Sequence, residues 1–162
     1  MKNIAQIVMN IGLMNRLELK MSITSFSGEH RFLSNFWPAE VEFQGIKFPS
    51  VEHAYVAAKT TDIEMRKAIA AVSTAGKVKR LGRELDLRPD WEQIKLEVML
   101  YLVKQKFEHP ELRKLLMATK PHELIEGNTW GDTFWGVCVN KEGDPVGLNH
   151  LGLILMHIRD SE

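Results

Sequence analysis

The chain has 162 residues, of which 44% are hydrophobic and 26% are charged, so it can form the core of one folded domain. Lys and Arg number 21, as do Asp and Glu, and the resulting zero net charge argues against a general electrostatic grip on nucleic acid. A single cysteine excludes an intramolecular disulfide, and no Cys/His spacing indicates zinc. We therefore expect a cytoplasmic protein that needs neither a metal nor a cofactor.

Residues 1–21 read as an N-terminal extension, and residues 22–162 as one domain. The extension is mildly apolar, but polar residues interrupt it well before the roughly 20 apolar residues that a spanning helix needs. It also lacks the small-residue cleavage site of a secretory signal. We expect no membrane-spanning segment.

The first part of the domain predicts a strand, a loop and a hairpin. Residues 23–26 are typical of a short strand, and residues 28–38 have no periodicity and indicate an ordered loop. Alternating apolar residues then bracket Gln44 and Gly45 between positions 41 and 48, which predicts a β-hairpin.

A helix is expected to begin after Ser50, a favourable N-cap residue. At about 100° per residue, Glu52 and Lys59 fall on the same edge of the apolar stripe, about 10.5 Å apart along the axis. His53 points away from this edge and is expected on the surface. The apolar stripe itself consists of Val51, Ala54, Tyr55 and Ala58.

An acid and an amine on one edge of a helix suit the cleavage of a glycosidic bond. A carboxylate at Glu52 can stabilise an oxocarbenium-like transition state or activate water. A partly desolvated amine at Lys59 can attack an opened sugar aldehyde. The alternative is that Glu52 only favours the helix N-terminus, while Lys59 is a solvated charge near its end.

Further helices are predicted along the rest of the chain. A basic helix from Ser73 places Lys79 and Arg83 on one side, where they can clamp a phosphate or simply be solvated. The long helix from Trp91 to about Phe107 is apolar on most sides and is expected at the centre of the domain. The other helices are expected after Asp62, over residues 111–118 and after Asn149, with strands at residues 124–125 and 134–139.

Residues 127–136 form a loop that contains two tryptophans and three glycines. Trp130 can stack on a base, and Asp132 can act as a general base or accept a ribose hydroxyl. The alternative is an aromatic turn that only joins two strands. Cys138, just beyond the loop, is expected to be a small buried residue in a strand.

In their order along the chain, these segments resemble the YbiA-like, or NADAR, family. The resemblance covers roughly residues 23–159 and implies an α+β fold, helix-rich and in a single domain, with a small β-sheet or hairpin. The segments that carry it are Leu33–Phe36, Phe48–Tyr55 with Ala58 and Lys59, Gly82 and Arg83 ahead of Trp91, Asn128–Gly136, and Gly147–Arg159.

The resemblance also implies the residues that act on the substrate. The essential glutamate of the family matches Glu52, an acidic residue matches Asp132, and a lysine proposed to act covalently matches Lys59. These three are the predicted catalytic residues. The predicted substrate-binding residues are Arg31, Asn35, Phe36, Tyr55, Arg83, Trp91, Trp130, Gly131 and Asn149.

The function implied by the resemblance is that of an N-glycosidase without a metal. Its expected substrates are phosphorylated ribosylamino-pyrimidine intermediates of riboflavin biosynthesis. One alternative is the removal of ADP-ribose from modified guanine, including guanine in nucleic acid. Another is a non-catalytic module that binds ADP-ribose or NAD. The sequence leaves the oligomeric state open.

Overall fold

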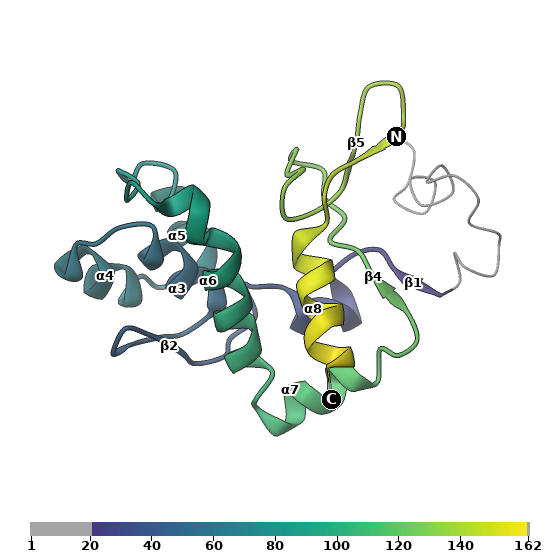
Figure 1. The fold of residues 1–162 in the computed structure, drawn as a ribbon, viewed down its shortest axis with the longest axis horizontal. Coiled ribbons are helices and arrows are strands. Elements are labelled where there is room, and N and C mark those ends of the chain that lie inside the picture. The colour runs from purple at the N-terminus through teal and green to yellow at the C-terminus, as the bar shows by residue number, and fades with distance from the viewer. Residues whose placement is uncertain (1–20, 162) are drawn as a thin grey trace. The chain divides into compact units, whose positions relative to one another are not determined.

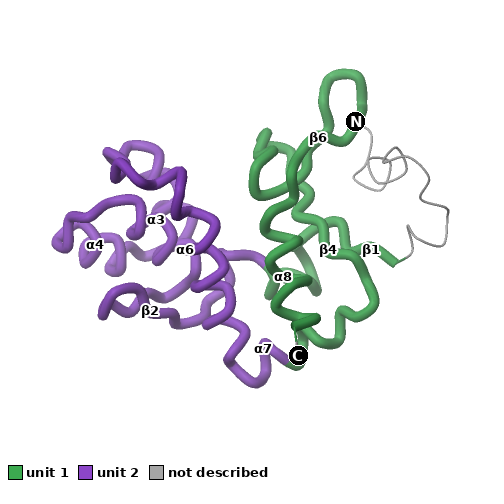
Figure 2. Tube along the Cα trace, in the orientation of Figure 1, with its two compact units in different colours: residues 1–33, 114–162 green, residues 34–113 purple. Residues whose placement is uncertain are grey.

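The structure, a computed structural model, describes residues 21–161, so nearly all of the predicted N-terminal extension lies outside it. The chain forms two compact units (Figure 2). Unit 1 contains the described residues up to Leu33 and those from Lys114 onward, and unit 2 is Ser34–Arg113. None of the helices in residues 21–161 is long and apolar enough to cross a membrane.

Unit 2 opens with the predicted hairpin. Strands β2 (Val41–Phe43) and β3 (Ile46–Phe48) pair antiparallel, with Val41 opposite Phe48. Gln44 and Gly45 have φ angles of 50° and 80°. A two-residue turn with two positive φ angles matches the twist of the flanking strands, and glycine adopts such an angle without strain. The hairpin prediction is confirmed.

Helix α3 (Val51–Ala58) is the central helix of unit 2 and lies beside α6 (Figure 1). The hydroxyl of Ser50 accepts a hydrogen bond from the His53 N–H, which confirms the predicted N-cap. The whole predicted stripe is buried, but so are Val56 and Ala57 on other sides, because α4, α5 and α6 all contact α3.

The prediction that His53 lies on the surface is wrong. Only 3% of His53 is exposed, since α4 and the chain after it cover that side of α3. Its Nε2 lies 3.0 Å from the Val72 carbonyl oxygen and its Nδ1 lies 2.7 Å from the Ser50 hydroxyl. Because a carbonyl only accepts, Nε2 donates the first bond and Nδ1 accepts the second.

The next two helices are short and capped. Helix α4 (Ile63–Ala70) follows Asp62, as predicted, and the Asp62 side chain caps it. Thr74 caps α5 (Ala75–Leu81). Helix α5 therefore begins later than the predicted Ser73. It ends at Gly82, so Arg83 lies in the following turn rather than on the helix.

Helix α6 (Trp91–Lys106) agrees with the predicted range, but only one of its sides is buried. Leu96 and Tyr101 are 40% and 52% exposed, while the opposite side carries the buried Met99 and Leu102. A single buried stripe is enough to pack against α3 and β2, while Ile94 and Leu100 beside it are half-buried.

The described part of unit 1 contains η1 (Gly28–Leu33), two pairs of short strands and α8 (His150–Asp160). Helix α7 (Pro110–Met117) joins it to unit 2 in sequence. Strand β1 (Ser22–Ile23) pairs parallel with β4 (Glu123–Leu124), and β5 (Cys138–Val139) pairs antiparallel with β6 (Pro145–Val146). The strands predicted over residues 23–26 and 134–139 are therefore shorter than expected, and the one predicted at 124–125 begins one residue earlier. The prediction that Cys138 is buried is wrong, because it is only half-buried.

The strand predicted over residues 134–139 is limited to its last two residues. The carbonyls of Phe134 and Trp135 accept hydrogen bonds from the His150 and Leu151 N–H groups at the start of α8. These two residues therefore cap a helix instead of joining a ladder. The prediction missed this because a helix start elsewhere in the chain competes for the same backbone groups.

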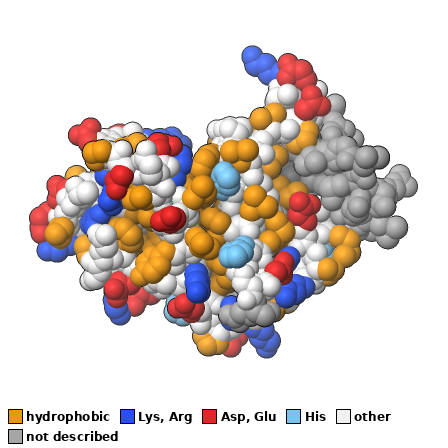
Figure 3. Space-filling view, in the orientation of Figure 1, with side chains coloured by type: hydrophobic (Ala, Val, Ile, Leu, Met, Phe, Trp, Pro, Cys, Tyr) orange, Lys and Arg blue, Asp and Glu red, His pale blue; other side chains and the backbone are white. Residues whose placement is uncertain are grey.

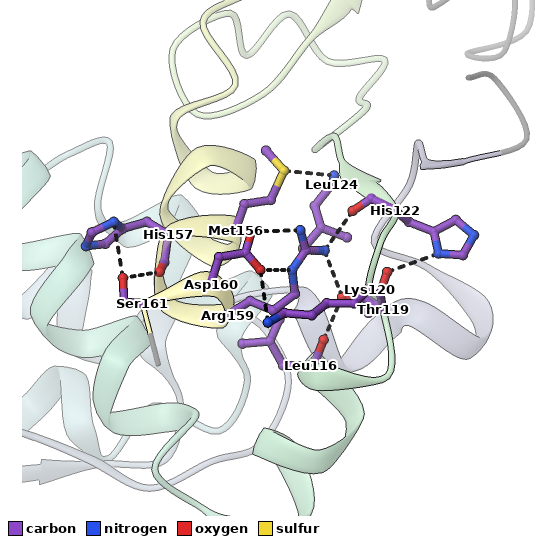
Figure 4. Close-up of polar contacts among 10 residues, drawn as sticks. All are labelled: Leu116, Thr119, Lys120, His122, Leu124, Met156, His157, Arg159, Asp160 and Ser161. Carbon is purple, nitrogen blue, oxygen red and sulfur yellow. Dashed lines mark hydrogen bonds and ion pairs between the residues drawn. The ribbon is translucent and has the colours of Figure 1, made fainter. Parts of the chain in front are cut away.

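A buried arginine ties α8 to the chain before β4 (Figure 4). The Arg159 guanidinium donates to the His122 carbonyl at 2.7 Å and to the Thr119 hydroxyl at 3.2 Å. It also donates to both carboxylate oxygens of Asp160. Because Arg159 is only 4% exposed, these partners compensate the burial of its charge.

The net neutrality of the chain is also visible on its surface. Acidic and basic side chains are interspersed over the visible face of unit 2 (Figure 3). This face presents no broad field of one sign, which agrees with the zero net charge of the chain.

Candidate active site

The backbone of unit 2 fixes Glu52 in the first turn of α3. Its N–H donates to the Asn35 carbonyl oxygen at 3.1 Å, so the loop before the hairpin supports the start of the helix. Glu52 is half-buried. The N-terminal end of the helix favours its negative charge, because free N–H groups carry partial positive charge there.

Lys59 lies directly after the last residue of α3 and is also half-buried. Its Nζ lies 5.5 Å from the centre of the Tyr55 ring. Burial lowers the pKa of the Lys59 amine, Glu52 opposes this change, and the like charges of Lys79 and Arg83 add to it. The predicted pairing of Glu52 and Lys59 on one edge of the helix agrees with this electrostatic coupling.

Two aromatic rings lie beneath the amine. The centres of the Tyr55 and Trp91 rings are 5.1 Å apart, with an angle of 57° between their planes. Both residues are buried, at 7% and 4% exposure. Trp91 therefore supports the Tyr55 ring from the core, and Tyr55 presents the ring face that meets Lys59.

Basic groups approach from α5 and the turn after it. Lys79 is half-buried, and its Nζ lies 5.7 Å from the centre of the Phe36 ring. Arg83 is exposed. We call the set Glu52, Tyr55, Lys59, Lys79 and Arg83 the amine site: it combines one carboxylate, three cationic groups and an aromatic platform.

Asn35 borders the amine site through its backbone bond to Glu52. Its side chain is buried, and Nδ2 points at the Met99 sulfur, 3.4 Å away. The Oδ1 atom has no hydrogen-bond partner among the described residues. Sequence patterns gave no signal for the backbone role, since any residue type supplies a carbonyl oxygen.

The predicted residues of the tryptophan-rich loop lie in unit 1. Asp132 is half-buried, and its Oδ1 accepts the N–H groups of Phe134 and Trp135 at 3.1 and 2.9 Å. Trp130 is 60% exposed, and Gly131 has a φ of 85°, which favours glycine. One oxygen of Asp132 therefore stabilises the turn that presents Trp130.

Sequence reasoning missed the residue that holds this loop. Asn128 is buried, its Oδ1 accepts the Asp132 N–H at 2.9 Å and its Nδ2 donates to the Asp132 carbonyl at 2.7 Å. The spacing of an Asn four residues before an Asp within a glycine-rich loop was the available signal.

The two remaining predicted residues of unit 1 differ in their surroundings. Arg31 is exposed in η1. Asn149 occupies the N-cap position of α8 with a φ of 53°, but no hydrogen bond of its side chain to the helix is seen in the described chain. Its amide instead accepts the Glu126 N–H and donates to the Leu124 carbonyl, at 3.0 and 2.9 Å.

Residues 24–161 match the family model described as the NADAR domain. The chain belongs to the NADAR domain family. The match covers both units of the structure, apart from their outermost residues, and confirms the resemblance inferred from the sequence.

Two curated relatives support this family assignment. The chain is 39% identical over 141 residues to N-glycosidase YbiA of Escherichia coli (strain K12), covering 84% of each protein. It is 38% identical over 134 residues to the riboflavin biosynthesis protein VVA0006 of Vibrio vulnificus (strain YJ016). That match covers 81% of this chain but only 35% of the longer relative.

A solved structure confirms the fold. The NMR structure of E. coli YbiA is similar with a TM-score of 0.71 and 36% sequence identity, over 86% of this chain and 82% of that one. The predicted α+β, helix-rich fold with small sheets is confirmed. As a NADAR protein with full-length N-glycosidase relatives, the chain is a hydrolase that acts on N-glycosyl bonds.

In residues 21–161 no group of three His, Cys, Asp or Glu side chains is placed to hold a metal ion.

Proposed function

We propose that this NADAR protein hydrolyses the N-ribosyl bond of phosphorylated ribosylamino-pyrimidine intermediates of riboflavin biosynthesis, with Glu52 and Lys59 as catalytic residues. One observation carries the proposal. Lys59 is a half-buried amine, beside a carboxylate and above an aromatic ring, whose pKa is lowered chiefly by burial. A larger share of such an amine is unprotonated near neutral pH than of an exposed lysine.

The reaction begins with loss of the bond between the ribose C1′ and the nitrogen of the base. Positive charge develops at C1′ and the ring oxygen, and the Glu52 carboxylate stabilises it. As this bond breaks, the base takes up a proton and departs as a free amine. The unprotonated Lys59 amine then adds to C1′, and the bond between C1′ and the ring oxygen breaks as that oxygen takes up the proton released by the amine, so that the opened sugar is held as a protonated imine. Water then hydrolyses the imine and releases the ribose phosphate, so that one water is consumed in each cycle.

The two further cations of the amine site suit a phosphorylated sugar. Lys79 is held over Phe36, and Arg83 follows α5 directly, so both charges lie on the side of α3 that carries Lys59. A phosphate would pair with them, and a guanidinium can bind it through two parallel bonds. Neutralisation by phosphate would also weaken their repulsion of the Lys59 charge.

The residues predicted in unit 1 are proposed for substrate contact within that unit, separately from the amine site. Asp132 is proposed as a second carboxylate through the oxygen that does not hold the turn. Trp130 and Gly131 are proposed to contact the base, and Arg31 and Asn149 the sugar phosphate. In unit 2, Asn35 and Phe36 are proposed to line the substrate.

The names of the relatives support the choice of substrate. VVA0006 is named a riboflavin biosynthesis protein, and YbiA is named an N-glycosidase. Removal of ADP-ribose from guanine uses the same bond type, because the ribose C1′ is again joined to nitrogen. Removal of ADP-ribose from guanine is therefore tested beside the proposed reaction.

The test incubates the purified chain with a ribosylamino-pyrimidine phosphate and, separately, with ADP-ribosylated guanosine, and identifies the released base by mass. We expect release from the first substrate. Glu52→Gln should abolish it, while Glu64→Gln, at an exposed acid on α4, should not. Release from the ADP-ribosyl substrate alone would overturn the proposed substrate. Tight binding of ADP-ribose without turnover of either compound would overturn the catalytic proposal.

A further inference from the structure

Gly82 occupies an unusual place at the end of α5. It is the C-cap residue and is buried against α3. A Cβ atom placed there would lie 3.0 Å from both methyl groups of Val56 and 3.5 Å from the Nζ atom of Lys59. The end of α5 therefore packs tightly on Val56, and a side chain at position 82 would reach ordinary contact distance from the Lys59 amine.

The backbone angle does not explain the glycine. Gly82 has a φ of −61° and a ψ of −17°, which every L-residue adopts easily. Glycine also weakens a helix end relative to alanine when no special angle is needed. The remaining structural reason is the space between α5, Val56 and Lys59.

We propose that Gly82 is a positioning residue for catalysis: its missing side chain lets the end of α5 pack on Val56 and leaves the Lys59 amine only partly shielded from water. The inference rests on the proposed role of Lys59. It assigns to α5 a function beyond supplying Lys79, because the helix backbone then forms one wall of the amine site.

The charged groups around the amine define what a change at Gly82 would alter. Glu52 acts from α3, Lys79 from α5 and Arg83 from the turn after it. On the side of α4, the Arg66 guanidinium is bound to the Ala57 and Thr60 carbonyls. Ahead of α6, Arg88 forms an ion pair with Asp90. None of these groups changes when a methyl is added at position 82.

A methyl at position 82 would therefore act through solvation. It would contact Nζ at ordinary van der Waals distance, and Val56 would need to move by only a few tenths of an ångström. Removing water from the ammonium form should lower the pKa of Lys59 further. A hydroxymethyl group would bring an oxygen near Nζ that can accept a hydrogen bond from the ammonium, so serine should give a higher pKa than alanine.

The test compares Gly82→Ala and Gly82→Ser with Gly76→Ala. Gly76 is in the same helix, and in the described structure no atom lies within 4 Å of a Cβ placed there. The amine is titrated directly by competitive acetylation of the intact protein, with the modified Lys59 peptide quantified by mass spectrometry. The pH profile of kcat is measured in parallel.

We expect Lys59 of Gly82→Ala to react roughly twofold or more faster than wild type at a pH below its midpoint, with Gly82→Ser slower than Gly82→Ala. Gly76→Ala should equal wild type. If Gly82→Ala fails to fold, Val56→Ala with Gly82→Ala is compared with Val56→Ala alone. Unchanged Lys59 labelling in the folded variants would overturn the inference.

Labelling separates this inference from the proposed function. A Lys59 titration that moves while the pH profile of kcat does not would confirm the shielding and overturn the catalytic role of the amine. It would therefore also remove Gly82 from the catalytic machinery. Coincident movement of both profiles would support both proposals.

Discussion

Replacing Lys59 by methionine should remove the activity and leave the fold intact. Methionine keeps an unbranched apolar side chain over the Tyr55 ring but has no amine. We expect kcat to fall by roughly a thousandfold or more, as for the loss of a nucleophile whose partners remain in place. Lys67→Met is the matched control, because Lys67 is an exposed helical lysine paired only with Glu64 in the described structure.

The stability change should be small because two contributions oppose each other. The ammonium lies 5.5 Å from the Tyr55 ring centre, a contact worth about 0.5–1 kcal/mol that the variant loses. Against this loss, the variant no longer buries a partly desolvated charge, which stabilises its folded state. We expect the free energy of unfolding in urea to differ from wild type by less than about 1 kcal/mol.

The same replacement gives a pH-dependent stability with a definite sign. The folded-state pKa of Lys59 is lowered from its model-peptide value, so the folded state binds this proton less tightly than the unfolded state. The resulting cost is fully present below the folded pKa and disappears as pH rises to the unfolded value near 10.4. Lys59→Met should therefore gain relative to wild type at neutral pH and lose this gain in alkali. A variant with near-normal kcat, or one several kcal/mol less stable, would refute the reasoning.

Three further changes test other parts of the structure. Glu52→Gln should lower kcat by about a hundredfold or more, because the charge that stabilises the transition state is removed, and should cost no more than about 1 kcal/mol of stability from the lost charge at the helix N-terminus. Arg159→Met should cost about 3–5 kcal/mol in urea unfolding, since it orphans buried acceptors of the network in Figure 4; an unchanged midpoint would contradict this. Gly152→Ala should prevent stable folding of unit 1, because its methyl would lie 2.1 Å from the Leu124 carbonyl oxygen. Amide hydrogen exchange in α8 of the variant that is as slow as in wild type would contradict this.

Local patterns in the sequence were sufficient for much of unit 2. The hairpin at Gln44 and Gly45, the cap at Ser50 and the helix that follows Asp62 all depend on near neighbours. Such features follow from backbone geometry and side-chain spacing, so the sequence alone was enough to predict them.

The failures arose where distant segments compete for the same groups. Burial of His53 depends on the Val72 carbonyl, 19 residues away, and an amphipathic wheel holds no information on that partner. The strand predicted over residues 134–139 is shortened to β5 because the His150 N–H, far along the chain, donates to the Phe134 carbonyl. The space at Gly82 depends on how closely α5 packs on α3, which is a tertiary distance and not a sequence pattern.

Reductive trapping of Lys59 tests the central claim most directly. The intact protein is incubated with the ribosylamino-pyrimidine phosphate and cyanoborohydride, which reduces an imine to a stable secondary amine, and the adduct is mapped by peptide mass spectrometry. We predict one ribose phosphate on Lys59 and none on the Lys59→Met variant. Turnover of the substrate with no trapped sugar on Lys59, or with the sugar on another residue, would contradict the mechanism.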